Sequence, residues 1–153
     1  MSCILRVSGE HLDVDALLSS VDLRPDNLWH RGEPRFKSKL NGKTHAHSGA
    51  NFVASHADFC EFQLQIEDAI IFLEDHAEKI AFILAFEGIE HASLDFGIEL
   101  RDMGTHSDIL PPRFLKAAGN SGVTVALSHY PCTKDEELAN TGRQATASPP
   151  PAT

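Results

Sequence analysis

Nine histidines occur among the 153 residues, and their densest local group lies between Thr44 and Cys60. His45 and His47 are two residues apart, so in an extended segment their side chains point to the same side. His56 follows as a third potential ligand, and imidazoles grouped in this way are typical of zinc coordination. A metal-dependent enzyme or metal sensor using His45, His47 and His56 is therefore one hypothesis. Surface histidines in a polar loop, with no cofactor, are the interpretation we favour.

The sequence motifs of nucleophilic catalysis and nucleotide binding are missing. The chain contains no GxSxG, no GxxxxGK[ST] and no GxGxxG. Cys3, Cys60 and Cys132 lie far apart without CxxC spacing, which is typical of a reducing compartment. We therefore expect a cytoplasmic protein without catalytic residues.

A basic segment interrupts an otherwise acidic chain. The whole sequence has 13 basic and 22 acidic residues, a net charge of −9. The segment from Arg24 to Lys43 contains six basic and two acidic residues, a net charge of +4. The remaining residues therefore have a net charge of −13. We expect this segment to be a long loop, and its residues could hold an anionic ligand by charge and stacking: Trp29, His30, Arg31 and Arg35. The acidic remainder argues against general nucleic-acid binding.

An acidic helix face with apolar members is the strongest indication of a partner. A helix is expected from about Glu67 to Phe86, and at 100° per residue its carboxylates gather opposite the buried stripe. Large apolar side chains project into the same sector, and such groups tend to mark contact surfaces. The residues of this predicted partner site are Glu67, Ile71, Glu74, Asp75, Glu78 and Phe82.

The elements that must position these residues follow from periodicity. Strands are predicted at 3–7, 50–55, 60–66, 92–100 and 123–130 from short apolar or alternating runs. Helices are predicted after Asp13 as N-cap, over 67–86, and from Pro111-Pro112 to Ala118. The fold class is therefore α+β: a two-layer sandwich, ferredoxin-like in spirit, with helices on one face of a mostly antiparallel sheet of four to five strands.

One domain of about 130 residues accounts for these elements. Residues 1–131 are expected to form it, because 42% hydrophobic composition is typical of a globular chain. Residues 132–153 have one large aliphatic residue and end in a proline run, so a flexible tail is predicted there. No apolar run is long enough to cross a bilayer, and the first residues lack the order of a signal peptide, so no membrane association is expected.

The chain resembles a family of small bacterial proteins, domain-of-unknown-function family 4279, over roughly residues 4–130. The resemblance rests on the opening strand running into Ser8-Gly9, the His30-Arg31-Gly32-Glu33 segment, the long central helix, and Leu110-Pro111-Pro112-Arg113-Phe114-Leu115 before a glycine turn and last strand. His47-Ser48-Gly49-Ala50-Asn51-Phe52 stands where the family would have a tryptophan. The resemblance implies the fold and no particular activity.

Three functions follow from these observations. A non-catalytic protein-binding module is the first, in concrete form an immunity-type protein that neutralises a basic toxin, because opposite charges speed association. The metal-dependent enzyme or sensor is the second. The third is a structural domain that forms a homodimer through a sheet edge or the central helix.

Overall fold

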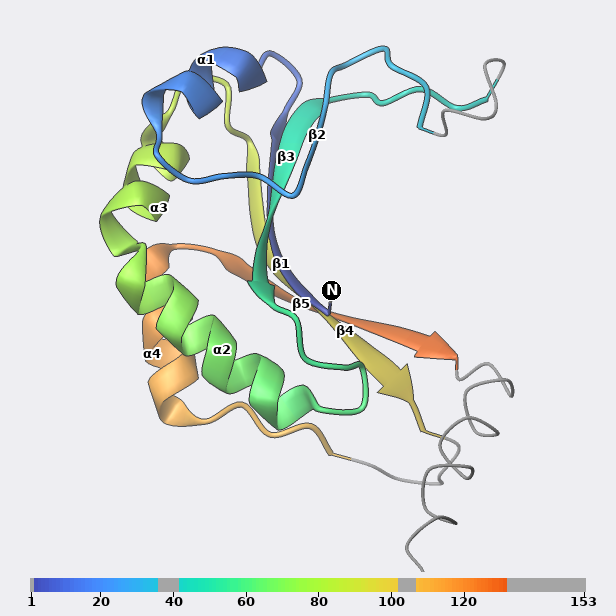
Figure 1. Cartoon of the computed structure of the whole chain (residues 1–153), viewed down its shortest axis with the longest axis vertical. Helices are drawn as coiled ribbons and strands as arrows, with labels where there is room; N and C mark the ends of the chain where they lie inside the picture. The colour runs from blue at the N-terminus through green and yellow to red at the C-terminus, as the bar shows by residue number, and fades with distance from the viewer. Residues whose placement is uncertain (1, 36–41, 102–106, 132–153) are drawn as a thin grey trace, which may run out of the picture.

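A computed structural model describes residues 2–35, 42–101 and 107–131 (Figure 1). It contains nine elements in these residues, in chain order β1 (Cys3–Gly9), α1 (Val14–Ser20), β2 (Asn27–Trp29), β3 (Ser48–Ser55), α2 (Phe62–Asp75), α3 (Ala77–Ala85), β4 (His91–Leu100), α4 (Pro112–Ser121) and β5 (Thr124–Pro131). The predicted tail, residues 132–153, lies outside the described residues.

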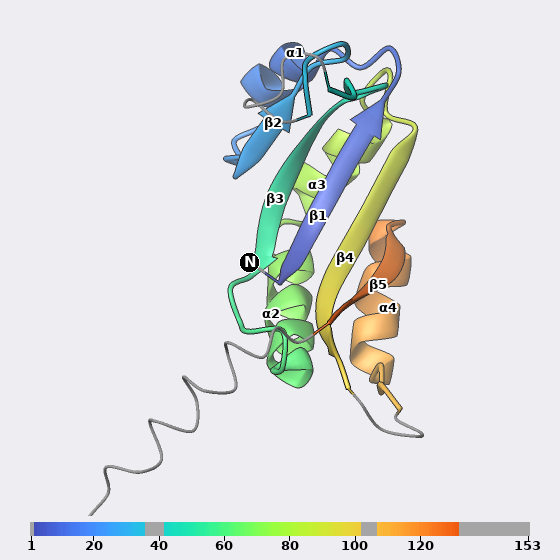
Figure 2. The same cartoon turned by 90° about the vertical axis from the view of Figure 1, so that its right-hand side faces the viewer.

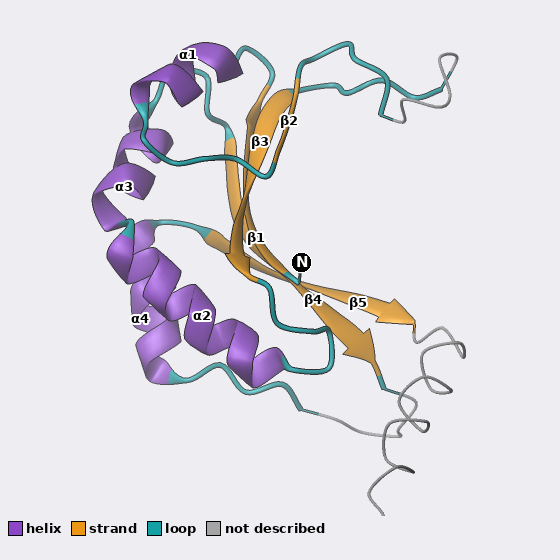
Figure 3. Cartoon of the chain, viewed as in Figure 1, coloured by secondary structure: helices purple, strands orange, loops and turns teal. Residues whose placement is uncertain are grey.

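The strands form one mixed sheet in the order β2-β3-β1-β4-β5. Its first three neighbouring pairs are antiparallel, while β4 and β5 are parallel and α4 forms the connection between them. The first four strands follow the order of the split β-α-β arrangement, which confirms the predicted two-layer α+β class. Figure 3 shows α2, α3 and α4 on one side of the sheet, and Figure 2 looks at the opposite, open face.

Alternation along the strands separates a buried face from an open one. Leu5 of β1 pairs with Phe52 of β3 and Leu94 of β4, and all three side chains are buried beneath the helices. Arg6 is the next residue along, and it lies opposite Asn51 on the other face. Because successive side chains of a strand point to opposite faces, one residue of register decides which groups reach the open face.

Sequence signals for helix starts are confirmed at α1 and α4, but the predicted end at Ala118 is wrong, because α4 continues to Ser121. The Asp13 carboxylate accepts a hydrogen bond from the Ala16 backbone N–H at 2.9 Å, which caps α1. α4 begins at Pro112, and Gly122 ends it with a φ of 70°, the left-handed conformation that glycine adopts most readily.

The predicted strand at 60–66 is wrong, because α2 begins at Phe62. Phe62 and Ile66 are buried, and residues four apart lie on one side of a strand and also on one side of a helix. The residues between them distinguish the two structures. Leu64 is exposed, whereas the fully buried Gln65 donates hydrogen bonds to the carbonyls of Asp58 and Gly97 at 2.9 Å.

The single helix predicted at 67–86 is two helices that meet at His76. His76 has φ −113° and ψ 19°, outside the helical values, and Figure 1 shows α3 turned relative to α2. Ile80 and Ile83 continue the buried stripe of Ile66 and Leu73 at helical spacing. The hydrophobic pattern runs through the break, so it contains no signal for it.

The predicted long loop between Arg24 and Lys43 contains a short strand. β2 pairs with β3, and Leu28 lies opposite Ala50. Beyond β2 the chain turns back on itself, because the Gly32 N–H donates to the His45 carbonyl at 2.8 Å and the Arg35 N–H to the Lys43 carbonyl at 3.0 Å. Three residues of strand are too few for a periodicity to be recognised.

Candidate binding surfaces

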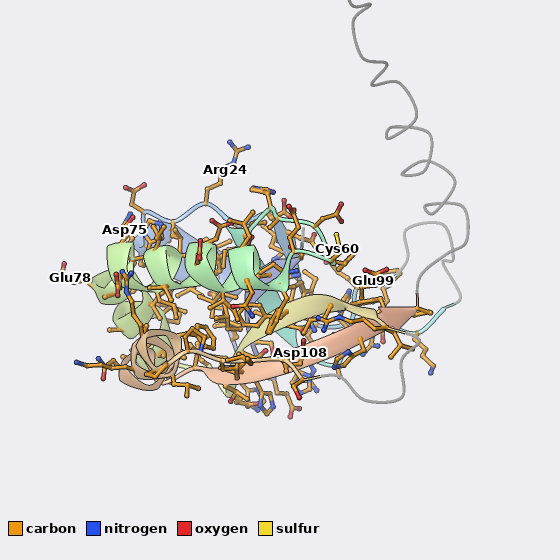
Figure 4. The ribbon with its side chains drawn as sticks, turned by 90° about the horizontal axis from the view of Figure 1, so that it is seen from below. Arg24, Cys60, Asp75, Glu78, Glu99 and Asp108 are labelled. Carbon is orange, nitrogen blue, oxygen red and sulfur yellow. The ribbon has the colours of Figure 1, made fainter. Side chains whose placement is uncertain are left out.

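The six residues of the predicted partner site are all exposed on α2 and α3. Ile71 exposes 54% of its surface and Phe82 exposes 45%, which are large fractions for apolar side chains. Asp75 and Glu78 point away from the body of the molecule on either side of the break at His76 (Figure 4). We call this set the acidic–apolar surface: Glu67, Ile71, Glu74, Asp75, Glu78 and Phe82.

Most of the charge on the acidic–apolar surface has no counter-ion among the described residues. Glu74 is the exception, because Arg113 of α4 reaches both of its carboxylate oxygens, at 3.2 and 2.6 Å. That hydrogen-bonded pair lowers the pKa of Glu74 and raises that of Arg113. Within the described parts of the chain, no ion pair involves Glu67, Asp75 or Glu78. The surface therefore presents unpaired negative charge around apolar groups.

One apolar residue of α2 was not among the residues predicted for this site. Leu64 exposes 44% of its surface and lies seven residues before Ile71, two helical turns along the same face. The alternating pattern that suggested a strand at 60–66 concealed it. Helical periodicity from Phe62 onward would have placed Leu64 beside the acidic–apolar surface.

The predicted anion-binding residues are largely paired with carboxylates. The Arg31 guanidinium lies 2.9 Å from Glu10, and the two ring nitrogens of His30 lie 2.9 Å from Asp15 and 3.3 Å from Glu33. Trp29 lies in β2 with its ring stacked on His45 at a centroid distance of 5.5 Å. Arg35 is exposed, and no ion pair joins it to another described residue.

His30 is the titratable group for which these contacts predict a change with pH. Its hydrogen bond to Asp15 raises its pKa, with the carboxylate of Glu33 adding to the effect. The backbone N–H of His30 donates to Glu33 at 2.9 Å and lowers the pKa of that carboxyl. The protonated imidazole thus links α1 to the segment after β2.

We expect the Asp15→Asn variant to return the His30 pKa toward its ordinary value of about 6.5. Because folding raises this pKa, the stabilisation is fully present below the unfolded pKa and is lost as pH rises through the folded one. The variant should therefore lower the melting temperature more at acidic pH than at pH values above the folded pKa. NMR titration of the His30 ring checks the first expectation, and melting curves check the second. An equal loss of melting temperature at acidic pH and at pH values above the folded pKa would contradict the second expectation.

A chain of polar contacts crosses the open face of the sheet. Arg6 lies at its centre, with Nε 3.4 Å from the Asn51 amide oxygen and a terminal nitrogen 3.6 Å from Asp95. The Ser128 hydroxyl donates to the other oxygen of Asp95 at 2.7 Å. The contacts therefore join β3, β1, β4 and β5, and they satisfy a carboxylate that is mostly buried.

The three histidines of the zinc hypothesis do not come together. His45 stacks on Trp29, while His47 lies at the start of β3 and His56 directly after its end. The eight residues of β3 separate His47 from His56, and these nine steps along an extended chain span about 30 Å at about 3.3 Å per residue. His47 instead lies beside Glu90 and His91, residues that are distant in sequence. Sequence spacing contained no signal for this group.

Neither described cysteine has the environment of an activated nucleophile. Burial strongly raises the pKa of the Cys3 thiol, and the charges of Asp95 and Asp68 add to the effect. The pKa of Cys60 is raised by desolvation and then by Asp58. Catalytic thiols have a lowered pKa, so the pKa of each of these two thiols is shifted in the opposite direction.

Comparison with family models, curated protein sequences and solved structures finds no match to this chain. The resemblance to domain-of-unknown-function family 4279 therefore stays a prediction. In the described residues, no helix combines the length and apolar character needed to span a membrane.

Proposed function

We propose that this protein is a non-catalytic module that binds a basic protein through the acidic–apolar surface of α2 and α3. The observation that carries the proposal is the exposure of Ile71 and Phe82 among carboxylates that lack counter-ions in the described residues. Protein contact surfaces combine an apolar centre with a charged rim. An exposed carboxylate rim repels other acidic surfaces and attracts basic ones.

Charge favours a basic protein over other occupants of this surface. Two copies of an acidic surface repel each other, which opposes a homodimer through α2 and α3. Phosphate backbones and anionic lipid headgroups are repelled for the same reason. A protein with basic residues around an apolar centre would pair with the free carboxylates and bury Ile71 and Phe82. The net charge of −9 would steer such a partner from a distance.

Replacing the apolar centre should abolish binding without unfolding the protein. The Ile71→Ser/Phe82→Ser double variant changes only exposed side chains, so the fold should remain. Tyr130→Ser is the matched control, because Tyr130 is 50% exposed and lies on the open face of the sheet, away from the helices. The full chain would capture proteins from a lysate of the organism that encodes it, with each variant in parallel. We expect one basic protein to be captured by the wild type and the control and lost by the double variant.

Salt and charge variants test the electrostatic part of the proposal. Asp75→Asn with Glu78→Gln should slow association of the captured protein, and rising NaCl should do the same, because screening weakens attraction between exposed charges. Stopped-flow or surface plasmon resonance measures the rate. An acidic partner, or binding that the double variant of Ile71 and Phe82 leaves intact, would contradict the proposal. A dimer of the chain that this double variant dissociates would establish the homodimer instead.

An immunity-type protein is the concrete form of this function. Its partner would be a basic toxin such as a nuclease, whose charge is opposite to that of this chain. When this protein is co-expressed with a basic toxin encoded by a neighbouring gene, it should restore the growth of cells that the toxin alone inhibits. The Ile71→Ser/Phe82→Ser variant should fail to protect, and the Tyr130→Ser variant should protect. If the Ile71→Ser/Phe82→Ser variant still protected the cells, the toxin would bind outside the acidic–apolar surface.

A further inference from the structure

We propose that His47, Glu90 and His91 form a zinc-binding site at one end of the sheet. One imidazole nitrogen from each histidine and one carboxylate oxygen of Glu90 all lie within 4.8 Å of one another. Two histidines and a glutamate are a ligand set that proteins use for zinc. This site is independent of the acidic–apolar surface and differs from the histidine group suggested by sequence spacing.

The register of β1 explains why these residues meet. Ser8 of β1 lies between Gly49 of β3 and His91 of β4. His47 precedes β3, so the two histidines flank the end of β1 from opposite sides, and their rings meet edge to face at a centroid distance of 6.0 Å. The strand end between them carries the small residues Ser8 and Gly9.

Backbone contacts hold the third ligand at the same place. The Glu90 N–H donates to the Ser8 carbonyl at 3.0 Å, which extends the pairing of β1 and β4 by one residue beyond His91. Glu90 and His91 are exposed and His47 is half-buried, so the three side chains can adjust their rotamers around an ion. Bringing their donor atoms to zinc requires distances of about 2.0–2.2 Å from each to the metal.

An adjoining cavity lies against two of the three proposed ligands. It has a volume of about 510 Å³, and Glu90 and His91 line it together with the hydroxyl residues Ser93 and Thr124. The cavity lies where β5 begins opposite Ser93, so the first residues of β4 have no strand beside them on that side within the described chain. Zinc held by three protein ligands at the edge of a cavity takes water or a small anion as its fourth ligand.

Calorimetric titration of zinc chloride into the chelator-treated full chain tests the site. We expect saturable binding of one ion, weakened at least about tenfold in His47→Gln, in Glu90→Gln and in His91→Gln. His45→Gln and His56→Gln are matched controls, because both residues lie outside the group and should leave the affinity unchanged. Circular dichroism confirms that each variant is folded. An absence of zinc binding by the wild type, or affinity unaffected by the first three substitutions, would overturn the proposal.

Paramagnetic NMR of the unaltered chain provides a measurement that needs no variant. Cobalt(II) is the probe, since it accepts the same nitrogen and oxygen ligands as zinc. We expect broadening of the amide signals of Ser8, Gly9 and His91 at substoichiometric cobalt, with the signal of His56 unaffected. Broadening centred on His45 or His56 would overturn the assignment. Because the acidic–apolar surface plays no part in either experiment, their outcome is separate from that of the proposed protein binding.

Discussion

Replacing Gly9 with alanine should severely destabilise the protein. A Cβ atom at this position would lie 1.7 Å from the carbonyl oxygen of Gly88, far inside van der Waals contact. The opposing atom belongs to the backbone, and Gly88 itself has a φ of 89° and lies close to the backbone of Leu12. Neither segment can move without disturbing the end of β1. We expect the free energy of unfolding to fall by about 3 kcal/mol or more.

Gly119 provides the matched control for this substitution. It lies in α4, and apart from its chain neighbours and the backbone of its own helix no described atom lies within 4 Å of the place that its Cβ would occupy. Gly119→Ala should therefore raise stability by about 0.5–1 kcal/mol, because glycine is a poor helix former. Urea denaturation of both variants against the wild type measures the difference. A Gly9→Ala variant within about 1 kcal/mol of the wild type would show that the two segments do not approach as closely as described.

Truncating Phe96 should cost about 3–5 kcal/mol of unfolding free energy. Phe96 of β4 is fully buried, and its ring meets Phe62 of α2 edge to face at 5.6 Å and Phe114 of α4 at 5.4 Å. Removing the ring takes away both aromatic contacts and leaves a cavity between the sheet and two helices. Because the three elements meet at this side chain, Phe96→Ala should weaken the whole core rather than one end of it.

Phe82→Ala is the control for Phe96, since it removes the same ring from an exposed position. Phe82 exposes 45% of its surface and contacts the ring of Phe86. Its truncation should cost less than about 1 kcal/mol, although it removes part of the proposed contact surface. Chemical denaturation monitored by circular dichroism compares the two variants. Equal losses would contradict the assignment of Phe96 to the core and Phe82 to the surface.

The sequence was informative where a local period spans a whole element. The alternation from Ala92 to Leu100 predicts β4, and Asp13 and Pro112 mark the starts of α1 and α4 because these signals depend on neighbouring residues. Helical spacing also groups the residues of the acidic–apolar surface within each helix, with Glu67, Glu74 and Asp75 around Ile71 on α2 and Glu78 one turn from Phe82 on α3. How these two groups lie relative to each other depends on the break at His76, for which the spacing has no signal.

The hydrophobic pattern is ambiguous where the strand period of 2 residues and the helix period of about 3.6 residues place the same residues on one side. Phe62 and Ile66 are four residues apart, which a strand and a helix both place on one side. Packing decided between them, because burial of Gln65 under β4 and exposure of Leu64 occur together only in a helix. The break at His76 and the pairing of β2 with β3 likewise depend on the surrounding sheet and helices.

The sequence by itself determined the α+β class, the starts of α1 and α4 and the separation of charge along the chain, because each depends on residues close in sequence. Only the tertiary structure decided which distant side chains meet. His47 lies beside His91 because both flank the end of β1, although 43 residues separate them. His30 and Arg31 are paired with carboxylates of α1 and of the turn before it, which the charge count of their segment could not show. Strand order and register bring these groups together, and neither has a signal in the spacing of the residues themselves.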